Sequence, residues 1–97
     1  MIHHVVLFNF LPTTTEPQLD AAERGLLAMK GQIAEVLDVR FGRNLGPSAD
    51  QYSHALLVVC EDMDAVRRYL DHPVHRNTVS TLIAPIRSAR MAVDFVV

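Results

Sequence analysis

The histidine and tyrosine side chains of this chain have the clearest capacity for acid–base chemistry. Tyr69 and His75 stand six positions apart, on either side of Pro73. A proline at this point predicts a bend between two helices, and such a bend can direct both side chains into the same space. A histidine exchanges a proton near neutral pH, and a tyrosine hydroxyl can orient it or stabilise a developing oxyanion. His75 and Tyr69 are therefore the candidate catalytic pair.

His4 and His54 are the candidate ligand-binding residues. Each lies near the start of a predicted strand. The alternation of side chains along a strand places both histidines on the sheet face that carries the larger aromatic side chains. If these strands are antiparallel neighbours, about four residues, or roughly 13 Å, separate the two histidines. They would then line opposite ends of a cavity. The alternative is that all four candidates are ordinary buried residues with satisfied hydrogen bonds.

No metal or cofactor site is indicated by the sequence. His72 and His75 are three residues apart, but Pro73 is expected to begin a helix, so His72 is expected to cap that helix. A third metal ligand at a supporting spacing and a glycine-rich nucleotide loop are both absent. We therefore predict that the protein folds without metal, haem, flavin or nucleotide.

Net charge, cysteine content and the length of the apolar stretches limit which partners and which cellular location we expect. The 97 residues carry a formal net charge of -2, and the arginines are dispersed. Nucleic acid is not expected as a partner, because phosphate binding requires a basic surface. The single Cys60 cannot form an internal disulfide, the N-terminus lacks a signal-peptide pattern, and no apolar stretch is long enough to span a membrane. We expect a cytoplasmic protein with no membrane partner and one domain over residues 1–97.

The hydrophobic pattern predicts the element order strand, helix, strand, strand, helix, strand. Thr15 is expected to cap the first helix, with Gln18 in the capping-box position, and Asp62 to cap the second. Pro73 is expected to break the second crossover in two. This order is typical of a ferredoxin-like α+β fold, a four-stranded antiparallel sheet with helices on one face. The predicted strands are 2–10, 37–41, 52–60 and 91–97, and the later helices are 62–70 and 73–85.

Both faces of the central strands are apolar. An antiparallel sheet with one solvated face should alternate apolar and polar residues instead. Two crossover segments cover only one face, so the other would expose more apolar surface than most monomers do. We therefore predict a homodimer through the helix-free faces, the alternative being a monomer with a modest patch. The predicted interface residues are Val5, Leu7, Ala55, Leu57 and Val59.

Several short segments form a combination that is typical of one protein family. They are HVVLFNF at 4–10, GRN at 42–44, YSHAL at 52–56, YLDHPVH at 69–75 and DF at 94–95. In this order and spacing they resemble the stress-responsive dimeric α/β-barrel family, often called Dabb, from about residue 2 to the end. The resemblance implies a ferredoxin-like fold and a homodimer whose two sheets form a barrel. It does not imply one reaction, because the family is defined by its fold.

The resemblance also implies roles for individual residues. In the polyketide-cyclase branch of the family, the histidine that closes His-Pro-x-His acts as a base, aided by a tyrosine six residues earlier. The matching residues here are His75 and Tyr69, while His4 and His54 match two further pocket histidines. That branch has another pocket tyrosine on its first helix, where this chain is aliphatic around Leu26. The same substrate class is therefore not expected.

Three functions remain open from the sequence. The first is a homodimeric small-molecule-binding or stress-related protein, with a hydrophobic carbonyl or aromatic ligand held between sheet and helices. The second is a cofactor-free enzyme of polyketide-cyclase-like type that uses His75 and Tyr69 for proton transfer. A weaker third is an antibiotic-biosynthesis-type monooxygenase, because such enzymes share this barrel. A ring-sized cavity beside a Tyr69–His75 pair would favour the enzyme, and a filled interior would favour the first function.

Overall fold

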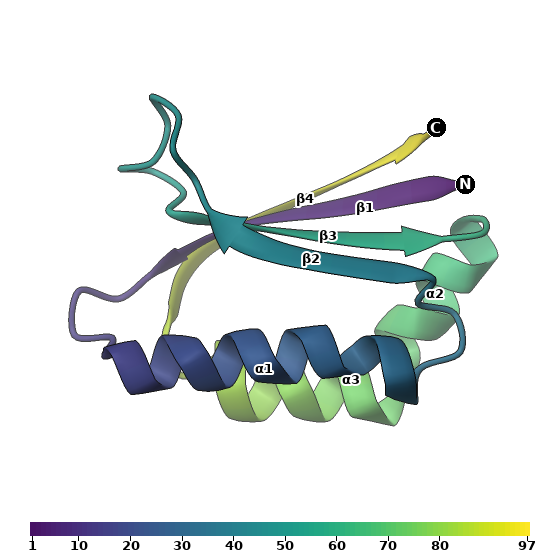
Figure 1. Ribbon diagram of the computed structural model, residues 1–97, viewed down its shortest axis with the longest axis horizontal. Coiled ribbons are helices and arrows are strands. Elements are labelled where there is room, and N and C mark those ends of the chain that lie inside the picture. Colours follow the sequence, from purple (N-terminus) through teal and green to yellow (C-terminus); the bar gives the residue numbers. More distant parts are fainter.

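The computed structural model describes residues 1–97 and has one four-stranded antiparallel sheet, in the order β2-β3-β1-β4. Its helices all lie on one face of that sheet (Figure 1). This is the ferredoxin-like α+β fold that the element order predicts. The strands are β1 (Ile2–Phe10), β2 (Asp38–Arg43), β3 (His54–Cys60) and β4 (Arg87–Val96), and the helices are α1 (Glu16–Gln32), α2 (Met63–Asp71), α3 (Pro73–Thr78) and the π-helical turn η1 (Val79–Ile83).

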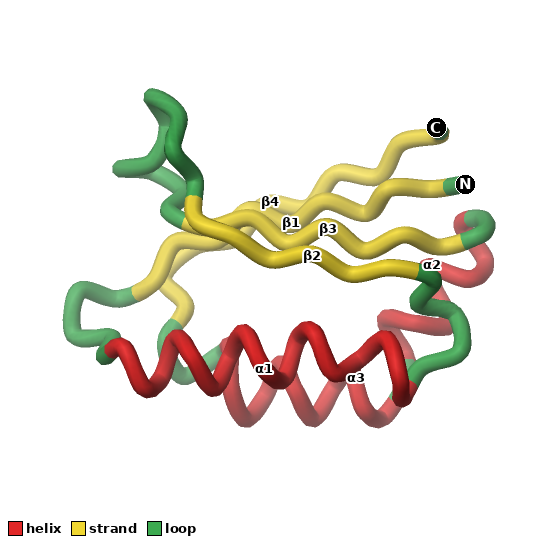
Figure 2. Tube along the Cα trace, viewed as in Figure 1, coloured by secondary structure: helices red, strands yellow, loops and turns green.

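The core lies between the sheet and the helices, and the opposite face of the sheet carries no element (Figure 2). Burial alternates strictly along β1, where every second residue from Ile2 to Phe10 is buried. Burial of apolar surface supplies the main stabilisation of such a layer. The helices contribute Ala22, Leu26 and Met29 from α1, Val66 and Tyr69 from α2, and Ile83 from η1.

Side-chain caps fix where the helices begin. The amide of Gln18 donates to Thr15 Oγ1 at 3.3 Å, and the amide of Thr15 donates to Gln18 Oε1 at 2.9 Å, which confirms the predicted capping box. Asp62 Oδ1 accepts from the amide of Ala65 at 2.8 Å. His72 Nδ1 accepts from the amide of Val74 at 3.1 Å, so His72 caps α3 as predicted.

The fourth strand begins earlier than the sequence pattern predicts. It starts at Arg87 rather than Met91, because Ala89 and Arg90 pair with the end of β1 at Asn9 and Phe8. The segment 87–90 is polar and lacks the β-branched residues that mark a strand, so only its tertiary pairing defines it. This extension brings two arginines beside the core.

The third helix departs from regular α-helical geometry after Thr78. The amide of Ala84 donates to the carbonyl of Val79 at 2.8 Å, closing a π-helical turn. The extra residue in the turn makes Ile83 the buried position. Leu82 packs instead over Gly25, where an added Cβ would stand 2.4 Å from Leu82 Cδ1. Glycine at this position therefore allows α1 to approach η1 closely.

None of the helices combines the length and the hydropathy that crossing a membrane requires.

Candidate functional site

A cavity of about 360 Å³ lies between the sheet and the second crossover. This volume falls near the lower end of the range for small-molecule sites, roughly 300–1,000 Å³. The apolar walls come from Val6, Phe8 and Leu56 of the sheet and from Leu26, Leu70, Val79 and Ile83 of the helices. The polar lining residues are His4, Tyr69, His75, Arg87 and Arg90.

Tyr69 and His75 meet at the wall of this cavity. Their ring centroids are 4.6 Å apart and the ring planes are inclined by 60°. Tyr69 comes from the last turn of α2 and His75 from the first turn of α3, so the break at Pro73 brings them together as the sequence predicts. Tyr69 is 1% exposed, and its ring forms part of the core.

One hydrogen bond fixes the tautomer of the neutral His75 side chain. Its Nδ1 lies 2.9 Å from the carbonyl oxygen of Leu70. A carbonyl only accepts, so Nδ1 carries the hydrogen and Nε2 of the neutral ring keeps a free lone pair. Nε2 has no protein partner, and since every fully buried side-chain nitrogen and oxygen has one, Nε2 remains accessible from the cavity.

Burial sets the charge states of both side chains. It lowers the pKa of His75 below its usual value of 6.5, while the Leu70 hydrogen bond acts in the opposite direction and the charges of His4 and Arg90 add to the lowering. His75 is therefore neutral at neutral pH and can act as a base. Burial raises the pKa of the Tyr69 phenol far above its usual value, so this hydroxyl stays protonated and donates.

His4 lies on the other side of Tyr69, with ring centroids 5.9 Å apart. Its Nδ1 stands 2.6 Å from Asp94 Oδ1, and the carboxylate orients the imidazole. The histidine side chain is 3% exposed and the aspartate 30%. The order Asp94, His4, Tyr69, His75 thus runs from the edge strand β4 through the sheet to the helices.

His54 does not share this cavity, so the expectation that it lines the end opposite His4 is wrong. The register pairs Phe8 with His54 and His4 with Val58, which confirms the four-residue offset. His54 stacks on Phe41 at 5.4 Å and meets Phe10 edge-on at 5.2 Å. Between the two histidines on this face lie Val6, Phe8 and Leu56, which form an apolar wall of the cavity.

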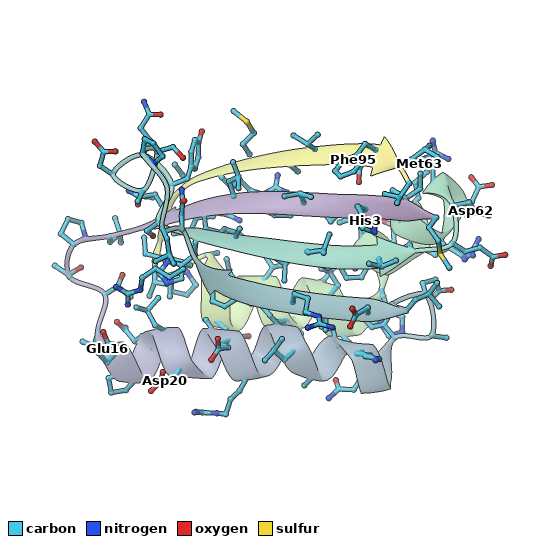
Figure 3. The ribbon with its side chains drawn as sticks, turned by 45° about the horizontal axis from the view of Figure 1, so that its top comes forward. His3, Glu16, Asp20, Asp62, Met63 and Phe95 are labelled. Atoms are coloured by element: carbon cyan, nitrogen blue, oxygen red, sulfur yellow. The ribbon has the colours of Figure 1, made fainter.

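His54 borders a separate surface cleft near the start of α1. Glu16, Asp20 and Arg43 also line that cleft, and Figure 3 shows the two acids on the first turns of the helix. Ser53 Oγ lies 2.8 Å from His54 Nδ1. Burial lowers the pKa of His54, and the Arg43 charge contributes. His54 therefore lies at the rim of the core, against two phenylalanine rings and outside the cavity that His4 lines.

No group of three or more histidine, cysteine, aspartate or glutamate side chains is placed to hold a metal ion.

The sequence model of the Stress Responsive A/B Barrel Domain, Dabb, matches residues 2–97. The chain belongs to the Dabb family. An uncharacterized protein of Streptomyces coelicolor is 32% identical over 82 residues, which cover 82% of this chain and 84% of that protein.

Solved structures agree with the ferredoxin-like fold of this Dabb chain. A dimeric ferredoxin-like protein of unknown function from Thermobifida fusca has a TM-score of 0.84 at 33% identity, with 99% of this chain and 90% of that chain covered. The hydroxynitrile lyase of Passiflora edulis has a TM-score of 0.87 at 15% identity, with 99% and 92% covered. The second likeness is one of fold alone.

Three polar residues around the Dabb cavity were not among the candidates from the sequence. Asp94 pairs with His4 across β1 and β4. The acidic–aromatic pair at 94–95 is the feature of the sequence that could have indicated this residue. Arg87 and Arg90 line the cavity but precede the predicted start of the fourth strand, so the alternation of the predicted strand does not include them. Because the predicted fourth strand starts four residues too late, the sequence did not indicate that two arginines line the site.

Proposed function

We propose that this Dabb chain is a homodimeric, cofactor-free enzyme that transfers a proton on a small apolar carbonyl compound. The observation that carries the proposal is the free Nε2 of neutral His75 beside the buried phenol of Tyr69, at the wall of a cavity of about 360 Å³. Because the cavity is large enough for a ring-sized ligand, a proton-transfer role is favoured over a purely structural one. Passive binding of the same compounds is the alternative.

In the proposed step, His75 Nε2 takes a proton from the carbon next to the carbonyl. The C–H bond breaks, an N–H bond forms, and negative charge moves onto the carbonyl oxygen as an enolate. The Tyr69 hydroxyl donates to that oxygen, and a preorganised donor stabilises such charge strongly in an apolar site. His75 then returns the proton to carbon, or to another atom of the product, so no cofactor is consumed.

Two further observations support this choice. His4, held by Asp94 at 2.6 Å, presents its other ring nitrogen as a fixed polar contact for a ligand. The hydroxynitrile lyase of Passiflora edulis has the same fold, so this fold accommodates catalysis on small organic molecules. The monooxygenase alternative has no comparable support among the residues of the cavity.

Hydrogen–deuterium exchange at carbon tests the proposal. Phenylacetone and acetylacetone, incubated with the protein in D₂O, report proton transfer through loss of their α-proton NMR signals. We expect wild-type protein to accelerate the exchange over buffer, and His75→Gln to reduce that acceleration by about 100-fold or more. His54→Gln is the matched control, because His54 lines no part of this cavity. Wild-type exchange at the buffer rate, or full activity in His75→Gln, would refute the enzyme.

We propose that the homodimer forms through the helix-free sheet face. Its exposed residues on β4 are Met91, Val93 and Phe95, each close to half exposed. Figure 3 shows Phe95 beside His3 on this face, and their ring centroids are 5.6 Å apart. The Thermobifida fusca relative is described as dimeric. A second copy would cover this apolar area and close the two sheets into a barrel.

We also propose a cytoplasmic location and a single domain over residues 1–97. The family match over residues 2–97 supports the domain extent, and the buried, unpaired Cys60 fits a reducing compartment. Fractionation of the producing cells tests the location, and recovery in the secreted fraction would contradict it.

A further inference from the structure

Two arginines give the cavity a cationic side. Arg90 sits on the helix-facing side of β4, opposite the inward-pointing Phe8, and Arg87 lies at the irregularity where β4 pairs with Phe10. Both line the cavity, and no aspartate or glutamate does. β4 is an edge strand of the sheet, and on it Arg90 is exposed to solvent and Arg87 is half-buried.

Neither of these arginines has an acidic partner. Four arginines, Arg40, Arg67, Arg68 and Arg76, each form an ion pair with a carboxylate. Arg87 and Arg90 form none, and unlike Arg24 and Arg43, which also form none, they line this cavity. Asp94, the acid on the same side of β4, is held by His4 at 2.6 Å. The charge of Arg90 reaches the interior, since it acts to lower the pKa of both His75 and Tyr69. The cavity therefore combines apolar walls with a positively charged opening at Arg87 and Arg90, whose charges no carboxylate neutralises.

We propose that the cavity binds an apolar organic acid, with its carboxylate between Arg87 and Arg90 and its apolar body against Phe8, Leu26 and Ile83. Guanidinium groups bind carboxylates through paired charge-assisted hydrogen bonds, and their planar geometry matches the two oxygens. The apolar body must be small, about one ring with a short chain, because the volume is about 360 Å³.

A carboxylate anchor narrows the substrate of the proposed enzyme to an oxo acid. Only the placing of the reacting carbonyl rests on the proposed function. An oxo acid anchored at the arginines would carry its carbonyl inward, toward the Tyr69 hydroxyl and His75. The anchoring itself requires no reaction, so binding can be measured independently of catalysis.

Calorimetric titration with matched probes tests the anchor. The probes are 4-phenylbutanoate, its neutral amide 4-phenylbutanamide, and 3-phenylpropylphosphonate, which have similar apolar bodies and different head groups. We expect the carboxylate to bind about tenfold or more tightly than the amide. Because the opening is solvent-exposed, that preference should shrink as sodium chloride rises. The phosphonate distinguishes a carboxylate site from a phosphate site.

Variants assign the preference to the two arginines. Arg87→Gln and Arg90→Gln should each reduce carboxylate affinity about tenfold while leaving amide affinity unchanged. Arg67→Gln is the matched control, because Arg67 is exposed on α2 and pairs with Asp64. Circular dichroism checks that each variant is folded.

Four results would overturn the anchor: equal affinity for acid and amide, an unchanged preference in both arginine variants, no binding of any probe, or a clear preference for the phosphonate. His75→Gln separates this inference from the proposed function. It should keep the carboxylate preference while losing proton exchange. If wild-type protein binds the acid selectively but exchanges no proton, the proposed function fails and the anchor stands.

Discussion

At the scale of single residues, the site depends on which nitrogen of His75 is free and on what surrounds Tyr69. Leu70 occupies Nδ1, and burial keeps the ring neutral. The tyrosine ring is buried in the core. Its hydroxyl has no hydrogen bond to a protein group, and since no fully buried side-chain oxygen lacks a partner, the hydroxyl is accessible from the cavity. A hydroxyl that is accessible and has no protein partner is available to a ligand. The ring of Tyr69 therefore has a packing role, and its hydroxyl has a separate, ligand-binding role.

Replacing Tyr69 with phenylalanine tests that separation. The ring should keep its packing, and unfolding free energy should change by about 1 kcal/mol or less, because no protein hydrogen bond is lost. Proton exchange on phenylacetone should fall by about 100-fold or more, as expected for loss of one oxyanion donor. Urea denaturation and NMR exchange rates provide the two readings. Undiminished exchange would show that the hydroxyl takes no part.

At the scale of elements, the sequence predicted best where a local signal specifies the backbone. Thr15 and Asp62 cap helices as expected, and the His72–Pro73 step divides α2 from α3. Structure that depends on distant parts of the chain was predicted less well. Nothing local in residues 87–90 marks a strand. The π-helical turn lies where the second crossover packs on α1 at Gly25, a contact that the local sequence does not indicate. The expectation that His4 and His54 share a cavity was wrong for a related reason. Alternation predicts the face of each histidine but not its tertiary neighbours, and His54 packs against Phe41 and Phe10 outside the cavity.

The capping box of α1 gives a prediction at this scale. Thr15→Ala removes the oxygen that accepts from the amide of Gln18, and it should cost about 1 kcal/mol of unfolding free energy. Thr13→Ala is the control, because the Thr13 side chain is exposed and caps no helix. Urea denaturation of both variants measures the difference. Equal stability of the two would mean that the box adds nothing to the helix start.

At the scale of the whole molecule, the helices are too few to cover both faces of the sheet. The crossovers cover one face, and the composition of β1 and β3 makes the other face apolar as well, which the sequence already indicated. The cavity lies between the sheet and the broken second crossover, and residues of α2, α3 and η1 line it opposite Val6 and Phe8 of β1. Its volume depends on the tertiary packing of side chains, and the sequence pattern alone could not supply it.

The proposed assembly is tested by placing a charge on the helix-free face. Leu57→Asp would bury an unpaired carboxylate between two sheets, at a cost of several kcal/mol, so the dimer should dissociate at micromolar concentration. The same change at Leu27, which is exposed on α1, should leave the dimer intact. Light scattering coupled to size exclusion measures the mass. A wild-type monomer, or a dimeric Leu57→Asp variant, would contradict this interface.

The central claim is that His75 offers a free, neutral Nε2 to the cavity, and nitrogen-15 NMR of the histidine side chains tests it most directly. At pH 7.5 the His75 ring should be the Nδ1-protonated tautomer, because Leu70 accepts from Nδ1. On lowering the pH, its signals should shift with a midpoint below 6.5, since burial opposes the charged ring. His75→Gln identifies the signals by their loss. An Nε2-protonated tautomer, or a midpoint above 6.5, would contradict the assignment of His75 as the base.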